Sequence, residues 1–452
     1  MKRVLLIILF LSNFVFAHKQ HVHQYISMEA YKLLKMSLGS DIRTMKERLG
    51  DWSSYYVGDR PWQRGYITTG AWREDMEDVV YGYSNNHLPD GATGEFITGL
   101  IKAMNNNNEY YSSITHFWYA DYGDNLRTTM TAGAHFLGIL TVQTFTMENA
   151  YQKLQQFVNG GWIANYTYET TTGCPSAAFG APQNYPILGI AFEYSNLIEF
   201  FKTGKAYARG HQNLAGYWSY VSPTEIFLGQ EFRERICFEI VGRMCHLLQD
   251  MSIPAHANID PHGTDLGKLP WQDDALIPDY YEEYFGYDFY WNYQNTYTQV
   301  GGYINPYQSS NPLHFLMYTT NQMANHFATQ GPHYNPPNDY FSGNPLPEET
   351  SYLNSLNISS FGAPTSINGP FDYNSIMNVR NRMFPQAIRA TAGLLYWFAK
   401  EADLLPIPLT GVYVSGTYDL YLGQTGNWYA QLGNGLEPFT YSWEIMYLDG
   451  AG

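Results

Sequence analysis

The most regular helical pattern in this 452-residue chain ends with the sequence His246-Leu-Leu-Gln-Asp250-Met-Ser-Ile-Pro254-Ala-His256. Apolar side chains recur at helical spacing from about Glu231 to Met251, at Phe232, Ile236, Ile240, Met244 and Leu247. Proline cannot continue a helix, so Pro254 is expected to end it. The pattern therefore predicts one long helix whose apolar stripe faces a core.

Two polar side chains interrupt the apolar surroundings near the end of this helix. His246 and Asp250 are four residues apart, so they project from the same face. A buried carboxylate without a partner is costly, and a zinc ion bound by imidazole and carboxylate removes that cost. Pro254 then allows His256 to turn back toward the same space. The alternative is a hydrogen-bonded His–Asp pair in the core.

Helical signals also occur on both sides of this segment. The earliest helix has one face formed by His23, Ile26, Ala30, Leu33 and Leu34. Further helical signals lie near residues 136–157, and another helix is predicted over about 386–402, with Ile388, Ala392, Leu395 and Phe398 on one stripe. Long loops rich in Tyr, Asn, Gly and Pro are expected over 280–308 and 331–372.

The periodicity of the apolar residues changes at Pro406-Ile407-Pro408. Beyond it, apolar residues alternate with period two, in the sets Val412/Val414, Trp428/Ala430/Leu432 and Phe439/Tyr441/Trp443/Ile445. Residues 437–443 resemble strands of the immunoglobulin-like repeats of exported bacterial proteins. Because such a sandwich needs about 100 residues, we expect an incomplete β module over 406–452, after a helical domain over 18–405.

The N-terminal residues have the character of a signal peptide. Lys2 and Arg3 precede the apolar run 4–16, and Val15-Phe16-Ala17 is followed by polar residues. The apolar run is too short for a membrane span. We therefore expect residues 1–17 to be removed and the protein to be secreted, either extracellular or on the cell surface.

Composition restricts the partners and the means of stabilisation. With 41 acidic and 25 basic residues the net charge is -16, which disfavours a stable nucleic-acid complex.

Cys237 and Cys245 share one predicted helix and would lie ~12 Å apart, too far for a disulfide. At most one bridge, to Cys174, is possible, and buried thiols are the simpler expectation.

The helix with His-x3-Asp, followed by Pro and His, resembles the zinc-dependent phospholipase C family and the related single-strand-specific zinc nucleases. The likeness extends over most of residues 18–402, in islands separated by unmatched loops. It implies a mainly α fold, the helical bundle of that family, with up to three Zn²⁺ ions. It also implies hydrolysis of phosphodiesters through a zinc-bound hydroxide.

The resemblance implies ligands residue by residue. Gly70-Ala-Trp-Arg-Glu-Asp75 matches the segment that supplies an aspartate to the first zinc, with Asp78 as the alternative. Ser113-Ile-Thr-His116-Phe-Trp matches the segment that supplies a histidine. The first zinc would then be held by Asp75, His116, His246 and Asp250. In this scheme Asp250 bridges to another zinc, and Asp75 also orients the attacking water.

The other two zinc ions are expected at the N-terminus and after the long helix. Cleavage after Ala17 would make His18 the first residue, so that its backbone and His23 bind the third zinc, with His21 competing for that role. The second zinc would be held by His256, His262 and Glu282. Pro278 stands where the family has a histidine, so Asp265 and Glu283 also stay open as ligands.

The resemblance leaves the substrate open between two branches. The acidic, aromatic-rich chain and the Tyr-rich loop after Glu282 favour a phospholipid, with transient contact to a membrane surface. The spacing between His18 and His23 matches the nuclease branch instead. A non-catalytic secreted binding protein, with Tyr-rich loops that grip glycans, is the alternative from another class.

Overall fold

The computed structural model describes the segments 20–51, 65–74, 115–136, 139–160, 164–167, 187–213, 217–259, 296–327, 345–361, 373–405, 412–416 and 425–432. These residues are mostly helical with small antiparallel sheets, so the predicted mainly α class is confirmed at this level. Within them, no helix has the length and apolar character needed to cross a membrane. The expected signal peptide, residues 1–17, lies outside the described residues.

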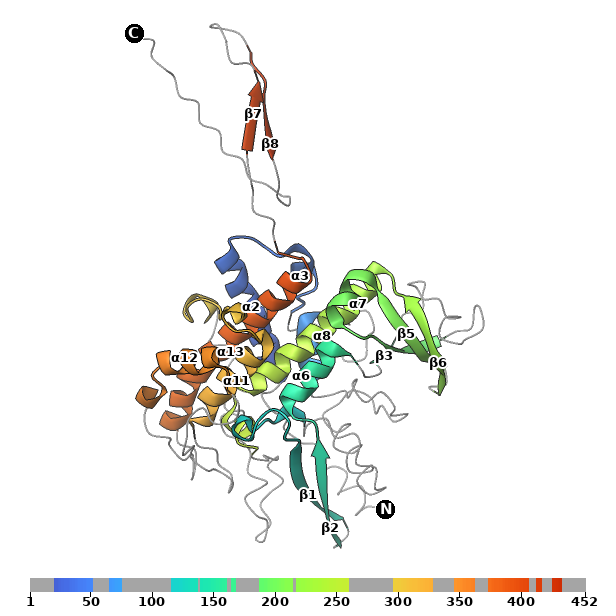
Figure 1. Ribbon diagram of the computed structural model, residues 1–452, viewed down its shortest axis with the longest axis vertical. Helices are drawn as coiled ribbons and strands as arrows, with labels where there is room; N and C mark the ends of the chain where they lie inside the picture. Colours follow the sequence, from blue (N-terminus) through green and yellow to red (C-terminus); the bar gives the residue numbers. More distant parts are fainter. Residues whose placement is uncertain are drawn as a thin grey trace, which may run out of the picture.

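The long helix α8 (Gln230–Asp250) runs through the middle of a helical body (Figure 1). It begins and ends within one residue of the predicted bounds. Around it pack α2 (Gln20–Leu38), α4 (Ile67–Arg73), α6 (Ala150–Asn159), α7 (Leu197–Thr203), α11 (Pro312–Asn325) and α13 (Tyr373–Glu401). The shorter helices are α3 (Arg43–Glu47), α9 (Pro254–Ala257) and α12 (Pro347–Ser355). The apolar stripe predicted for α8 is buried in this core from Ile236 onward, and Phe232 is partly buried against it.

Helices α4 and α8 approach each other backbone to backbone. A Cβ atom on Gly242 would overlap the carbonyl oxygen of Ile67, and one on Gly70 would overlap that of Glu239. Only glycine at both positions therefore permits this spacing. The close approach brings the C-terminal turn of α4 directly against the last two turns of α8.

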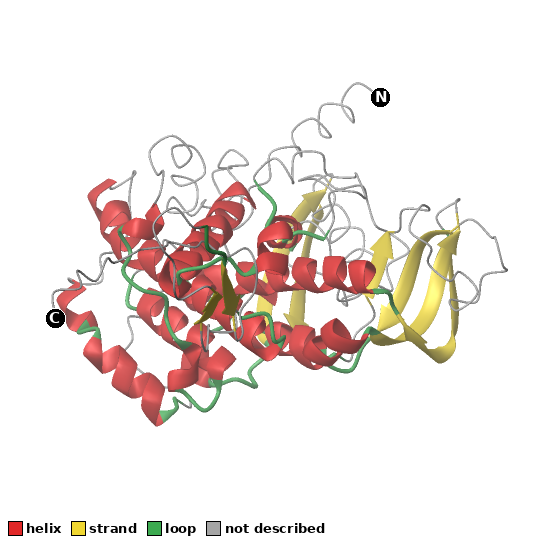
Figure 2. Cartoon of the chain, turned by 90° about the horizontal axis from the view of Figure 1, so that it is seen from above, coloured by secondary structure: helices red, strands yellow, loops and turns green. Residues whose placement is uncertain are grey.

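The strands among the described residues pair into three antiparallel sheets. Strands β3 (Ala164–Thr167), β4 (Ile187–Glu193), β5 (Lys205–Asn213) and β6 (Trp218–Phe227) form one sheet in that order, at an edge of the helical body (Figure 2). Strands β1 (Thr128–Phe136) and β2 (Ile139–Met147) form a hairpin. Strands β7 (Val412–Gly416) and β8 (Trp428–Leu432) stand apart from the body (Figure 1).

Several sequence expectations need correction. The helical signals near 136–157 are wrong up to Met147, where β1 and β2 pair with Phe136 opposite Ile139. Threonine is frequent in this hairpin, and its branched side chain favours strands. The last helix begins at Tyr373 rather than near 386 and continues through Pro385. The expected loop over 331–372 contains α12, which begins at Pro347, the position where proline suits a helix.

Other expectations hold in the described residues. Helix α2 contains the predicted face that begins at His23. The alternating residues of β7 and β8 are paired strands, with Val414 opposite Ala430. Cys237 and Cys245 are buried, unlinked thiols, and burial raises the pKa of both.

A buried histidine connects three elements on one side of the body. His314, in the first turn of α11, contacts Glu349 of α12 through Nδ1 at 2.5 Å and Asp124 through Nε2 at 3.0 Å. The rings of Trp118, Tyr151 and Tyr318 surround it. Burial lowers the pKa of His314, but the contacts to the two carboxylates outweigh this and raise it to about 9. The imidazolium thereby ties α12 and the segment after Trp118 to α11.

Candidate metal centre

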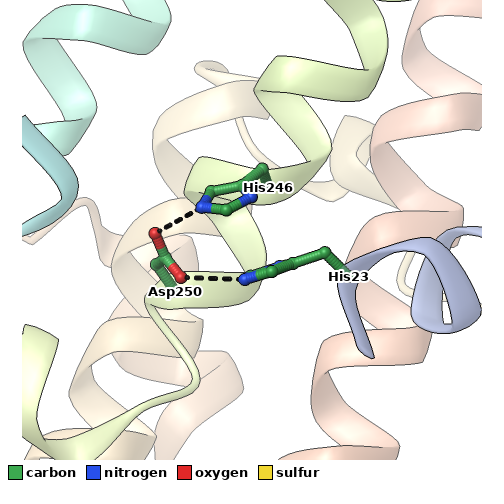
Figure 3. Close-up of side chains that lie close together, drawn as sticks. All are labelled: His23, His246 and Asp250. Carbon is green, nitrogen blue, oxygen red and sulfur yellow. Dashed lines mark ion pairs between the residues drawn. The ribbon is translucent and has the colours of Figure 1, made fainter. Parts of the chain in front are cut away.

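Asp250, the last residue of α8, is surrounded by histidines from four parts of the chain. His246 lies one turn earlier on α8, and His23 comes from the first turns of α2 (Figure 3). His116 lies in the turn that precedes Trp118, and His256 lies on α9. Each of the five side chains is at most 1% exposed. The helix that carries Asp250 thus places a buried carboxylate among four imidazole side chains.

The distances show how the histidines divide between the two carboxylate oxygens. Nε2 of His23 lies 3.5 Å from Oδ1. Oδ2 lies 3.2 Å from Nε2 of His246, 3.3 Å from Nδ1 of His116 and 3.8 Å from Nδ1 of His256. Ligand atoms of His23, His246 and Asp250 all lie within 4.8 Å of one another. The three groups are therefore close enough to contribute to metal binding.

Three of the histidines have their Nδ1 atoms fixed by oxygen acceptors. His246 Nδ1 donates to the carbonyl oxygen of Ala71 at 2.6 Å. His256 Nδ1 donates to the carbonyl oxygen of His116 at 3.0 Å. His23 Nδ1 lies 2.7 Å from Oε1 of Gln249. Because the proton is then on Nδ1, the lone pair is on Nε2, as in histidines that bind metals.

The local sequence explains why these acceptors are available. Ala71 lies in the last turn of α4, where carbonyl oxygens lack a partner within the helix. Gln249 donates through Nε2 to Ser27 at 3.0 Å, which orients its oxygen toward His23. The α4–α8 glycine contact brings Ala71 within reach of His246. Backbone path and helix spacing therefore set the ring orientations.

The electrostatics favour a cation beside Asp250. Burial raises the pKa of Asp250, but the positive charges that His246, His256 and His23 carry when protonated hold it well below its usual range. Neither of its oxygens accepts a well-angled hydrogen bond from the described residues. Burial lowers the pKa of His116 despite opposing contacts with Glu74 and Asp250, which favours the neutral form of its ring. A carboxylate and imidazole nitrogens are the donor types that zinc takes in proteins.

Glu74 is a part of the site that the sequence analysis did not identify. Its Oε1 lies 3.7 Å from Nε2 of His116 and 2.5 Å from Nζ of Lys153, while Oε2 lies 2.9 Å from Nη1 of Arg243. Burial raises the pKa of Glu74, but Lys153, His116 and Arg243 together hold it far below the usual value. The sequence did contain a sign of a buried charge near this site, because Lys153 occupies an apolar position of α6 between Ala150 and Phe157.

Some of the predicted ligands lie together in the structure, and the others fall outside the described residues. The structure brings together His23, His116, His246, Asp250 and His256. His18, Asp75, His262 and Glu282, and the alternatives Asp78, Asp265 and Glu283, lie outside the described residues. His21, the alternative to His23, is half-buried and does not belong to the group of ligand atoms found among the described residues.

Comparison with protein-family models, with curated proteins and with solved structures returned no match. The site is thus defined by its own geometry, as a buried histidine–aspartate group that could hold a metal ion in a mainly helical protein.

Proposed function

We propose that this chain is a secreted zinc-dependent phosphoric diester hydrolase, of phospholipase C type, that acts on phospholipids. One observation carries the proposal. The buried carboxylate of Asp250 faces four histidines that come from separate segments, and three of these have Nδ1 fixed by an oxygen. A hydrogen-bonded core pair would need only one histidine, so this excess of imidazoles favours a metal centre.

The division of the histidines between the two oxygens of Asp250 supports a bridging role. Oδ1 faces His23, whereas Oδ2 faces His246 and His116. One carboxylate can therefore contribute to two ion positions, one toward α2 and one toward the His116 turn. Bound zinc would polarise the phosphoryl oxygens and make water acidic enough to react near neutral pH. The chain's own contribution is to orient the imidazoles and to keep bulk water away from them.

Charge balance favours a lipid over a nucleic acid as substrate. A nuclease must hold several phosphates, and each such contact commonly uses Lys or Arg. The chain has 25 of these residues against 41 acidic ones. In the described site the two nearby cations, Lys153 and Arg243, are buried and paired with Glu74. A phospholipid presents a single phosphodiester to the metals, so it needs no basic groove.

The first experiment combines metal analysis with a substrate panel. Purified protein should contain tightly bound zinc and should release phosphorylated head groups from phosphatidylcholine in micelles. A chelator should abolish this release, and added Zn²⁺ should restore it. Hydrolysis of single-stranded DNA or RNA without turnover of phosphatidylcholine would instead support the nuclease branch. Protein that binds no zinc and cleaves no phosphodiester would exclude both enzymes and favour a binding protein.

Two histidines on the same helix provide a matched pair of variants. His23 faces Asp250, whereas His21, two residues earlier, is not in the group of ligand atoms. We expect His23→Ala to lose zinc and activity and His21→Ala to keep both. The reverse result would assign the metal to His21 and reject the geometry proposed for His23.

A further inference from the structure

The imidazole of His116 is turned differently from those of His23 and His246. The latter two present Nε2 to Asp250, at 3.5 and 3.2 Å. His116 presents Nδ1 to the same carboxylate, at 3.3 Å, and its Nε2 lies 3.7 Å from Glu74 Oε1. If His116 binds an ion beside Asp250, it does so through Nδ1, and the proton must then be on Nε2.

Glu74 is in turn held in place from two sides. Lys153 Nζ contacts its Oε1 at 2.5 Å and also donates to Thr115, the residue before His116, at 2.8 Å. Arg243 Nη1 lies 2.9 Å from Oε2. Glu74 and the two cations are each at most 1% exposed. Three chain segments therefore meet at one buried carboxylate whose position is set by charge.

This charge arrangement argues against Glu74 as a direct ligand. Its two oxygens already face one cation each, and an ion bound there would be a third positive charge around a single carboxylate. The His116 proton fits that place better, because a carboxylate beside an imidazole N–H is the usual outer partner of a metal-binding histidine.

We propose that Glu74 is a positioning residue, which keeps the His116 proton on Nε2 and thereby aims Nδ1 at the metal position beside Asp250. Lys153 and Arg243 hold Glu74 for this purpose. The inference rests on the metal centre of the proposed function and adds a role for the buried cluster of Glu74, Lys153 and Arg243.

The test compares Glu74→Gln with Glu239→Gln. Glu239 is a fair control because it is also buried and lies 3.9 Å from Arg243, but it accepts a hydrogen bond from the backbone N–H of Gly65. In metal-free protein with ¹⁵N-labelled histidine, the His116 ring should be the Nε2–H tautomer in the wild type and in Glu239→Gln. In Glu74→Gln the Nδ1–H form should become populated, and zinc affinity, measured against a chromophoric chelator, should fall roughly 10- to 100-fold.

A second variant separates the change of tautomer from any loss of folding that unpaired buried charges would cause. Glu74→Gln leaves Lys153 and Arg243 without their shared carboxylate, whereas Glu74→Gln with Lys153→Met removes one charge of each sign. The double variant should show the same change of tautomer. An unchanged tautomer and zinc affinity in a folded Glu74 variant, or an equal loss in Glu239→Gln, would overturn the inference and leave the proposed function intact. Wild-type protein without zinc would instead remove the proposed function, while the tautomer would still report the contact between Glu74 and His116.

Discussion

At the scale of single residues, the centre depends on how each imidazole is fixed rather than on the number of histidines. Three Nδ1 atoms are bound by oxygens of Ala71, His116 and Gln249. The fourth histidine, His116, has Nδ1 3.3 Å from Asp250 and Nε2 on the side of Glu74. Because Asp250 faces all four histidines, its removal should have the largest effect on the site.

The first residue-scale prediction concerns Asp250→Asn. Because its oxygens face histidines on two sides, the amide should lower the zinc content by more than one ion per chain and abolish phosphodiester hydrolysis. Removal of one member of a buried charged cluster should also destabilise the fold by roughly 3–5 kcal/mol. Elemental analysis and urea unfolding measure the two effects.

Asp41→Asn is the matched control for this change. Asp41 pairs with Lys35 and Lys46 at the surface and contacts no residue of the centre. The control should keep its zinc and lose at most about 1 kcal/mol. Full zinc content and turnover in Asp250→Asn would exclude the bridging role.

At the scale of elements, the contact between α4 and α8 connects packing to chemistry. Gly70 and Gly242 let the two backbones touch, and this spacing places the Ala71 carbonyl 2.6 Å from His246 Nδ1. Any side chain between the helices would increase that distance. The geometry of the candidate metal site is therefore sensitive to a position with no polar atom of its own in the site.

A methyl group at Gly242 tests this coupling. Gly242→Ala should force α4 away from α8, lower stability by about 1–3 kcal/mol and weaken zinc binding. Gly302→Ala is the control, because nothing lies within 4 Å of a Cβ at that position. Thermal unfolding and chelator competition measure both variants. If Gly242→Ala binds zinc like the wild type, the spacing of α4 and α8 does not control the centre.

The elements also show what the sequence could and could not predict. Helix α8 has a long apolar spine and an abrupt end, so its bounds and its His246–Asp250 face were predictable. The β1–β2 hairpin was not, because its pairing joins residues whose local pattern also suits a helix. Glu74 was missed because its buried partner Arg243 is 169 residues away, so the sequence around Glu74 itself does not encode the contact.

At the scale of the whole molecule, buried charges contribute to global stability as well as to the site. His314 joins α11 to α12 and to the segment that begins with His116 and ends at Asp124. Its pKa is raised from 6.5 to about 9 by the two carboxylates, against the effect of burial. The folded protein thus binds this proton more tightly than the unfolded chain does.

The raised pKa of His314 determines whether the protein gains or loses stability as pH rises. Stabilisation by His314 is complete below pH 6.5, the unfolded pKa, and is lost as pH rises through about 9. The loss should reach roughly 3 kcal/mol over this window. The urea midpoint of metal-free wild type should therefore fall between these pH values, whereas that of His314→Gln should be lower at pH 6 and change less. An equal fall in both proteins would assign the alkaline loss of stability to other groups.

The backbone acceptors have a consequence for how such a protein can change in evolution. Two of the three oxygens that fix Nδ1 atoms are main-chain carbonyls, of Ala71 and His116. A carbonyl is present whatever side chain its residue has, so mutation at position 71 cannot delete the acceptor as long as the path of α4 is kept. The orientation of His246 is thus set by the course of the chain, and it can be kept when the neighbouring side chains change.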